Sequence, residues 1–266
     1  MIPAISAALD IIVGNAVNLQ NANGAGRAYE LYMMTAIAER LLTTGAQVRI
    51  KRSDGSFVLP TDTNRGFVQR GGGPSGIPGA SQGPGNMSAI AFRLSGSARE
   101  WEIWNGVQFN GRSGGQHEFD IAIVSSHTAD TLRATPTGGS PFGRPAVAIE
   151  CKDVASAGSV DEMRALVARL YDVTALIGHG PYLSWASSPM SSIHPGQAHL
   201  EPARTSFRES NMNSYSAIIR KTGFTSGATA VSGYYFIHPF ADVFLGSAQE
   251  TAFLDNLINW IECNLA

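Results

Sequence analysis

One short apolar segment ends abruptly in charged residues, and it limits the possible folds more than any other part of the sequence. Residues 145–153 read Pro-Ala-Val-Ala-Ile-Glu-Cys-Lys-Asp. Successive side chains of a strand point to opposite faces, so Glu150 and Lys152 share one face and Cys151 takes the other. Charges at the end of a buried strand are tolerated when they are paired or bind a metal ion. The segment therefore predicts a buried strand that ends at a functional site.

Lysine is rare in this chain, which makes Lys152 informative. Of 19 basic residues, three are lysines, namely Lys51, Lys152 and Lys221. Arginine stays protonated in proteins, whereas the pKa of a lysine shifts with its surroundings. We therefore expect Lys152 to have a specific chemical role.

The composition is that of an ordinary globular protein. The chain has 266 residues, of which 44% are hydrophobic and 15% charged. The net charge of −2 excludes a protein held on nucleic acid by bulk positive charge, so any such contact must come from a local group of arginines. Cys151 and Cys263 belong to no zinc-binding pattern and are typical of a reducing compartment. No apolar stretch approaches the roughly 18 residues of a membrane span. We expect a cytoplasmic protein with no membrane segment.

Helix and strand patterns indicate a single α/β domain over residues 1–266, built on a mixed sheet flanked by helices. Apolar periodicity predicts helices at 2–20, 25–44, 160–177 and 248–264. Other patterns predict strands at 48–51, 56–59, 88–94, 99–110, 118–124, 146–152, 182–185 and 231–237. The composition also predicts a flexible Gly/Pro loop at 70–86 and a loop-rich segment at 187–230, a candidate for substrate or partner contacts.

Three acidic residues fall where they can meet Lys152. Glu30 lies on the apolar stripe of the 25–44 helix, Asp120 lies at the start of one strand, and Glu150 lies at the end of another. If those two strands are antiparallel neighbours, Asp120 lies beside Glu150. Adjacent carboxylates repel unless a proton or a metal ion lies between them, and oxygen ligands suit Mg²⁺ or Mn²⁺. The sequence thus predicts a divalent-metal site.

These four residues resemble the motif of the PD-(D/E)XK nuclease superfamily, which has a restriction-endonuclease-like fold. That motif has a Glu on a helix, then an Asp and a (D/E)-x-K on a strand hairpin, then a helix packed on the sheet. Here the corresponding residues are Glu30, Asp120, Glu150 and Lys152. The resemblance covers a core of about residues 25–180. No proline precedes Asp120, and Phe119 stands there instead. Because many members lack that proline, the departure weakens the resemblance only slightly.

The resemblance implies roles for these residues. Asp120 and Glu150 would bind the catalytic Mg²⁺, for which Mn²⁺ can substitute, and the backbone carbonyl of Cys151 would be a further ligand. Lys152 would position the attacking water. Glu30 would support the metal shell or bind a second metal ion.

Other residues have two open interpretations. Glu118 is either a further ligand beside Asp120 or a solvated edge residue. Arg164 and Arg169, on the helix after Lys152, either reach the scissile phosphate or lie on a solvated face. A basic C-terminal segment either contacts nucleic-acid phosphates or carries solvated loop charges; its residues are Arg204, Arg208, Arg220 and Lys221.

The resemblance implies a metal-dependent DNA endonuclease that hydrolyses phosphodiester bonds, in a prokaryotic restriction or anti-phage defence system. Cutting both strands usually needs two sites, so a homodimer or higher oligomer is expected. The sequence has no recognisable helix-turn-helix, zinc finger or ATPase motif, so a partner protein or an activating signal is a possible source of target choice. Two alternatives stay open: a catalytically inactive binding or structural subunit with the same fold, and an RNA nuclease on the same scaffold.

Overall fold

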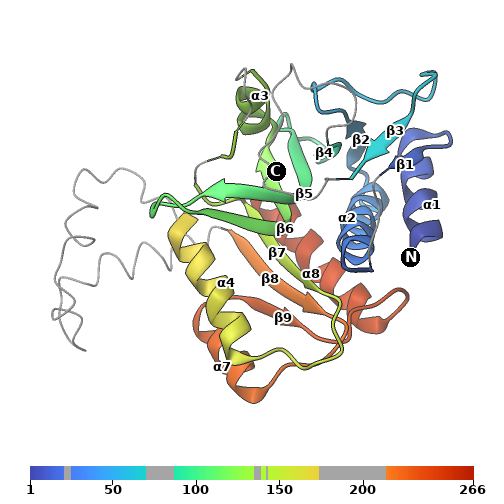
Figure 1. The fold of residues 1–266 in the computed structure, drawn as a ribbon. Helices are drawn as coiled ribbons and strands as arrows, with labels where there is room; N and C mark the ends of the chain where they lie inside the picture. The colour runs from blue at the N-terminus through green and yellow to red at the C-terminus, as the bar shows by residue number, and fades with distance from the viewer. Residues whose placement is uncertain (21–24, 70–86, 135–138, 142, 174–213) are drawn as a thin grey trace.

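A mixed sheet of seven strands forms the centre of the described protein, and helices cover both of its faces (Figure 1). The computed structural model describes residues 1–20, 25–69, 87–134, 139–141, 143–173 and 214–266. The strand order across the sheet is β2 (Gln47–Lys51), β4 (Ala89–Arg93), β5 (Trp101–Asn110), β6 (Gln116–Ser125), β7 (Val147–Lys152), β8 (Tyr215–Arg220) and β9 (His238–Phe240). Neighbours from β2 to β7 are antiparallel, whereas β7, β8 and β9 run parallel. The predicted α/β class with a mixed, helix-flanked sheet is confirmed.

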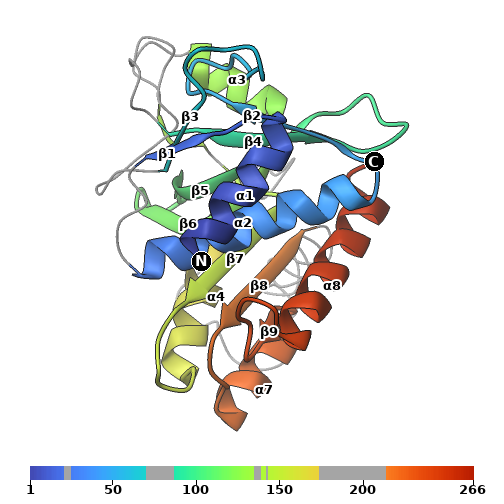
Figure 2. The ribbon, with the colours of Figure 1, turned by 90° about the vertical axis from the view of Figure 1, so that its right-hand side faces the viewer.

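The helices divide between the two faces of this sheet. One face packs against α1 (Ile2–Val13), α2 (Ala25–Thr43) and α8 (Ala248–Asn264), which lie in front of the sheet in Figure 2. The other face packs against α3 (Ser126–Ala134), α4 (Val160–Val173) and α7 (Ser226–Tyr234). A small parallel sheet pairs β1 (Asn18–Gln20) with β3 (Gly66–Val68). Because both faces are covered, the inner strands β7 and β8 are buried at nearly every position.

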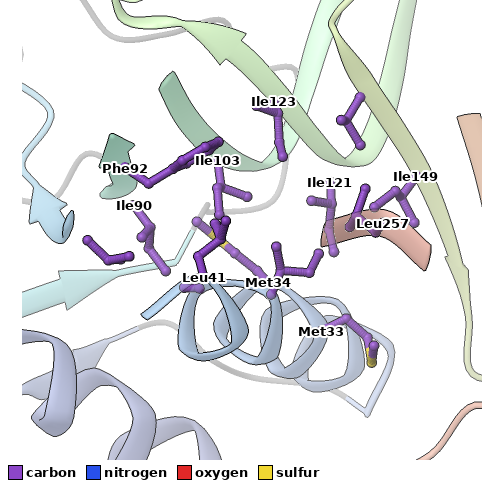
Figure 3. Packing of buried hydrophobic residues seen from close by; sticks show 14 of the residues in the cluster. Met33, Met34, Leu41, Ile90, Phe92, Ile103, Ile121, Ile123, Ile149 and Leu257 are labelled. Atoms are coloured by element: carbon purple, nitrogen blue, oxygen red, sulfur yellow. The ribbon is translucent and has the colours of Figure 1, made fainter. Parts of the chain in front are cut away.

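The larger core lies between α2 and the sheet. Met33, Met34 and Leu41 project from α2 toward four strands (Figure 3). The isoleucines they meet are Ile90, Ile103, Ile121 and Ile149. Burying each side chain of this size contributes roughly 1.5–3 kcal/mol. This packing fixes α2, and with it Glu30 near its start, against β5, β6 and β7.

Local signals explain where the predicted helices begin and end. Ser247 caps α8, since its side chain accepts a hydrogen bond from Glu250 N–H at 3.0 Å. The amide of Glu162 donates to Ser159 Oγ at 3.2 Å at the start of α4. Gly45, with a φ of +85°, follows the end of α2. The described parts of the predicted helices at 25–44, 160–177 and 248–264 are therefore confirmed within a residue, whereas the helix predicted at 2–20 ends at Val13.

The strand predicted at 231–237 is wrong. Helix α7 continues to Tyr234, and the amide of Ile237 donates to Ser232 O at 3.0 Å before β9 begins. The side chain of Thr225 accepts a hydrogen bond from the amide of Ala228 and starts this helix. The cap and the tertiary packing outweigh the β-branched and aromatic residues that suggested a strand.

The loop-rich segment predicted at 187–230 is also wrong over its described part, 214–230. That part contains β8, which is buried at every position, and the start of α7. The strand predicted at 56–59 is limited to one bridge, from Phe57 to Lys51. Backbone hydrogen bonds from Arg52 N–H to Ser56 O and from Val58 N–H to Ile50 O lie beside it. The loop predicted at 70–86 and the strand predicted at 182–185 lie outside the described residues.

Candidate active site

Strand pairing brings Asp120 next to Glu150. β6 and β7 are antiparallel, and their pairing ends with Ile121 opposite Ile149. One step further, this register sets Asp120 opposite Glu150. The amide of Cys151 donates to Asp120 Oδ2 at 2.7 Å. The prediction that these two strands are antiparallel neighbours is confirmed.

The β5–β6 hairpin changes face at Asp120. Residues two apart in a regular strand share a face, yet Ile121 packs in the core under α2 and Phe119 packs in the core under α4. Gly106 falls opposite Asp120 in the register of the flanking pairs, and its φ of +60° is a conformation that favours glycine. At this break in the pleat, Asp120 hydrogen-bonds the backbone of β7 and packs in neither core.

Two further carboxylates, of Glu30 and Glu118, belong to the site around Asp120 and Glu150. Glu30, from the second turn of α2, accepts a hydrogen bond from Asn105 Nδ2 at 3.1 Å. Burial raises the pKa of Glu30; the Asn105 hydrogen bond lowers it, but the charge of Glu118 adds to the rise. We call Glu30, Glu118, Asp120 and Glu150 the acidic group.

Glu150 is held by two cations and keeps one oxygen open. Its Oε1 forms ion pairs with Lys152 and with Arg169 of α4, the latter at 3.0 Å. The Glu150 side chain is 5% exposed, and its Oε2 is buried without a hydrogen bond from any described residue. A buried acceptor without a donor costs free energy. This oxygen is therefore suited to a further donor or cation.

The group carries excess negative charge. Burial raises the pKa of Asp120 well above its ordinary value, and the carboxylates of Glu150 and Glu30 raise it further. Burial alone would lower the pKa of Lys152, but Glu150 and Asp120 raise it above its ordinary value. Lys152 is thus protonated, and its single charge does not balance the carboxylates around it.

The available ligands fit a hard divalent cation. Within the described ranges, no three or more His, Cys, Asp or Glu side chains are already grouped to hold a metal ion. Asp120 and Glu150 nevertheless lie together, and the Cys151 carbonyl points to the same side of β7 as its N–H, toward Asp120. Two carboxylates and a carbonyl suit Mg²⁺, which usually keeps several waters. The unpartnered Oε2 of Glu150 supports this fit.

Arg220 is not available to nucleic acid, and that prediction is wrong. Its side chain is 1% exposed, is ion-paired with Glu162 and donates to Ser156 O at 2.5 Å. The reason is position, because Arg220 ends an inner strand and is covered by the segment that leads into α4.

The other predicted nucleic-acid contacts differ in their exposure. Arg164 is exposed beside Asp161 on α4, and Lys221 is about one-third exposed in an ion pair with Asp153 at 2.6 Å. Arg169 contacts Glu150 and donates to the backbone carbonyl of Glu118 at 3.1 Å, so it belongs to the site. Arg204 and Arg208 lie outside the described residues.

Asn105 lies inside the site, although sequence reasoning did not select it. Its Nδ2 donates to Glu30 Oε2 and, at 2.9 Å, to the carbonyl of Asp120. An amide side chain in the middle of a largely apolar strand, followed directly by Gly106, is the signal that could have identified it.

Comparison with protein-family models, with curated proteins and with solved structures finds no match to this chain. Within the part of the chain that the structure describes, no helix combines the length and the apolar character needed to cross a membrane.

Proposed function

We propose that this protein is a metal-dependent endonuclease that hydrolyses phosphodiester bonds of DNA, with a restriction-endonuclease-like core. The observation that carries the proposal is the register of β6 and β7, which sets Asp120 beside Glu150 on the strand that bears Lys152. Glu30 joins them from α2. These residues lie on the kinds of element, and in the chain order, that the PD-(D/E)XK motif has.

Asp120, Glu150 and the Cys151 carbonyl would hold Mg²⁺ or Mn²⁺, with Glu30 supporting this shell or binding a second ion. When bound, the ion supplies Lewis-acid chemistry, because it makes water more acidic and neutralises charge on a phosphate oxygen. The open Oε2 of Glu150 and the raised pKa of Asp120 both support a site that is completed by a cation.

Lys152 acts as a hydrogen-bond donor to the attacking water in this proposal. Because Glu150 and Asp120 raise its pKa, Lys152 keeps its proton and orients the attacking water through a hydrogen bond, rather than accepting a proton from it. Its charge also offsets the negative charge that grows on the phosphate as the water oxygen bonds to phosphorus and the ester bond breaks. The attacking water releases its proton to solvent, and the leaving ester oxygen takes one up. Arg169 holds the Glu150 carboxylate through the same oxygen, Oε1, that Lys152 contacts.

The biological setting is part of the same proposal. We propose a role in a prokaryotic restriction or anti-phage defence system, with a homodimer or higher oligomer supplying the second site that a double-strand cut needs. Target choice comes from a partner protein, an activating signal or the protein's own loops. Free Cys151 and Cys263 support work in the reducing cytoplasm.

One observation favours the alternative of an inactive binding or structural subunit. Lys152 and Arg169 already neutralise Glu150 without any metal ion. In that case the ion pairs are structural, and replacing the acidic residues does not change ligand binding. An RNA nuclease would use the same chemistry on a different substrate.

The test compares substrates and metal ions directly. Supercoiled plasmid and single-stranded RNA are incubated with the protein in Mg²⁺, in Mn²⁺ and in EDTA, alongside Asp120→Ala and Lys152→Ala. We expect the wild type to nick or linearise plasmid with either metal ion, and EDTA and both substitutions to abolish cleavage. Cleavage of RNA alone would move the proposal to the RNA enzyme. If both substrates stay whole in both metal ions, the enzyme proposal fails for the isolated protein.

A further inference from the structure

We infer that Asn105 and Gln69 form a buried amide relay that positions Glu30 against Asp120 and thereby sets how tightly the site binds its divalent ion. The inference rests on the proposed function. Asn105 lies in the middle of β5, and Gln69 directly follows β3. The two residues are 4% and 1% exposed. Neither was selected from the sequence, and neither is part of the PD-(D/E)XK motif.

Asn105 joins the two strands of the hairpin to α2. Its Nδ2 donates to Glu30 Oε2 at 3.1 Å and to the backbone carbonyl of Asp120 at 2.9 Å. One amide group therefore fixes both the carboxylate of Glu30 and the backbone that carries the Asp120 carboxylate. Its position next to Gly106 places it at the break where Asp120 leaves the regular pleat.

Gln69 fixes the orientation of Asn105. Its Nε2 donates to Asn105 Oδ1 at 3.1 Å and to the carbonyl of Arg27, in the first turn of α2, at 2.9 Å. Because Asn105 Oδ1 accepts from Gln69, Asn105 Nδ2 must face Glu30. The relay therefore links the start of α2 to β5 and β6.

Stability alone does not explain these amides. Burying an amide costs free energy that its hydrogen bonds only offset, and Gln69 Oε1 is buried without a hydrogen bond from any described residue. An apolar side chain of similar size at position 69 would fill the same space without the unpaired Oε1 of Gln69. Glu30, by contrast, gains a fixed orientation from the relay. Partners that orient metal ligands typically affect metal affinity by about 10–100-fold.

The test measures metal binding separately from catalysis. Mn²⁺ affinity is measured by titration calorimetry without nucleic acid for the wild type, Asn105→Leu and Gln69→Leu. Asn110→Ala is the matched control, because Asn110 lies on the same strand and donates to Ser140 O at 2.7 Å, away from the acidic group. Thermal unfolding in EDTA establishes that each variant is folded. The Mg²⁺ concentration that gives half-maximal cleavage is the second readout.

We expect Asn105→Leu to bind Mn²⁺ about tenfold more weakly and to need correspondingly more Mg²⁺. Gln69→Leu weakens Mn²⁺ binding and raises the required Mg²⁺ concentration by a smaller factor. If Asn105→Leu does not fold, Gln69→Leu alone decides the test. Asn110→Ala matches the wild type. If folded Asn105→Leu and Gln69→Leu bind Mn²⁺ like the wild type, the relay inference is overturned while the proposed function stands. If the wild type binds no Mn²⁺, the proposed function fails and the relay fails with it.

Discussion

At the scale of single residues, members of the acidic group have opposite effects on the metal-free protein. Asp120 lies among other carboxylates, and its pKa is raised by burial and by their charge. Glu150 is instead paired with Lys152 and Arg169. The Asp120 carboxylate therefore destabilises the folded state, whereas the Glu150 carboxylate stabilises it. Such a cost is expected where a site is built to bind a cation.

Asp120→Asn is expected to stabilise the metal-free protein. The asparagine oxygen can still accept the hydrogen bond from Cys151 N–H, while the substitution removes a negative charge from the acidic group. The expected gain is about 0.5–2 kcal/mol, the usual range for a single stabilising substitution. In a protein of this size each 1 kcal/mol gained raises Tm by about 2–4 °C. Thermal unfolding in EDTA at neutral pH measures it, and a lower Tm would contradict the account.

The advantage of Asp120→Asn is expected to shrink as the pH falls. A carboxyl whose folded-state pKa is raised destabilises the fold fully only at a pH above that raised pKa. As the pH falls below it, the wild-type Asp120 takes up a proton in the folded protein, and the penalty declines until it is lost near the ordinary aspartate pKa of about 4. Unfolding free energies of both proteins at several pH values between neutrality and pH 5 test this. A difference that is independent of pH would argue against the raised pKa.

Glu150→Gln is expected to destabilise the protein by about 2 kcal/mol. The substitution leaves Lys152 and Arg169 without their shared carboxylate. Breaking a buried ion pair typically costs about 3–5 kcal/mol, and the partial exposure of these two cations reduces the effect. Urea unfolding in EDTA measures it. The exposed Glu262→Gln, on α8, is the control and should change stability by less than about 0.5 kcal/mol.

Single residues were predictable from the sequence where alternation along a strand fixes them. The spacing of Glu150 and Lys152, with Asp120 at the start of a neighbouring strand, was enough to bring the three together. The rarity of lysine was a weaker signal, because Lys51 and Lys221 are also ion-paired, with Glu102 and Asp153. Asn105 was missed because its partners come from α2 and from the segment after β3, whose approach to β5 no local pattern reveals.

At the scale of elements, the end of the β5–β6 hairpin is fastened to the last turn of α4. His117 Nε2 lies 2.6 Å from Asp172 Oδ2, and Ser113 Oγ donates to the same oxygen at 2.6 Å. Arg112 donates to the carbonyl of Tyr171 at 2.8 Å. Because α4 also carries Arg169, this contact fixes the helix that holds Glu150.

Asp172→Ala is expected to loosen this contact. Loss of the carboxylate removes the contacts of Asp172 with His117 and Ser113, so amides in 110–117 should exchange hydrogen faster. Because each such hydrogen bond contributes about 1 kcal/mol, the free energy of unfolding should fall by about 1–2 kcal/mol. Hydrogen exchange followed by mass spectrometry measures the change. Asp161→Ala, an exposed aspartate at the other end of α4, should leave that segment unchanged. Unaltered exchange in Asp172→Ala would show that the hairpin is held by other contacts.

Elements with long periodic patterns were predictable, whereas short ones were not. The helices at 25–44 and 248–264 have apolar stripes that match buried faces. Strands β1, β3 and β9 have three residues each, too few for a pattern. The helix α7 was mistaken for a strand because Val231, Tyr234 and Tyr235 favour strands locally.

At the scale of the whole molecule, the acidic group lies where the sheet changes from antiparallel to parallel pairing. β7 is antiparallel to β6 and parallel to β8, so it joins the two halves of the sheet. The sequence predicts a mixed sheet, but not that β8 follows β7 in space, because that order depends on packing between segments far apart in the chain. The position of β7 inside the sheet makes Glu150 a buried residue, and the burial of Asp120 beside it raises the pKa of the Asp120 carboxyl.

The most direct measurement for the central claim is the single-turnover rate of cleavage of a labelled DNA duplex by excess protein in Mg²⁺. The wild type, Asp120→Asn and Asp62→Asn are compared, the last being a carboxylate away from the acidic group that pairs with Arg52. The account predicts cleavage by the wild type and by Asp62→Asn at similar rates. It predicts that Asp120→Asn cleaves at least about 100-fold more slowly than the wild type, which is beyond the typical effect of removing a residue that only orients a metal ligand. Cleavage by folded Asp120→Asn at the wild-type rate would contradict it.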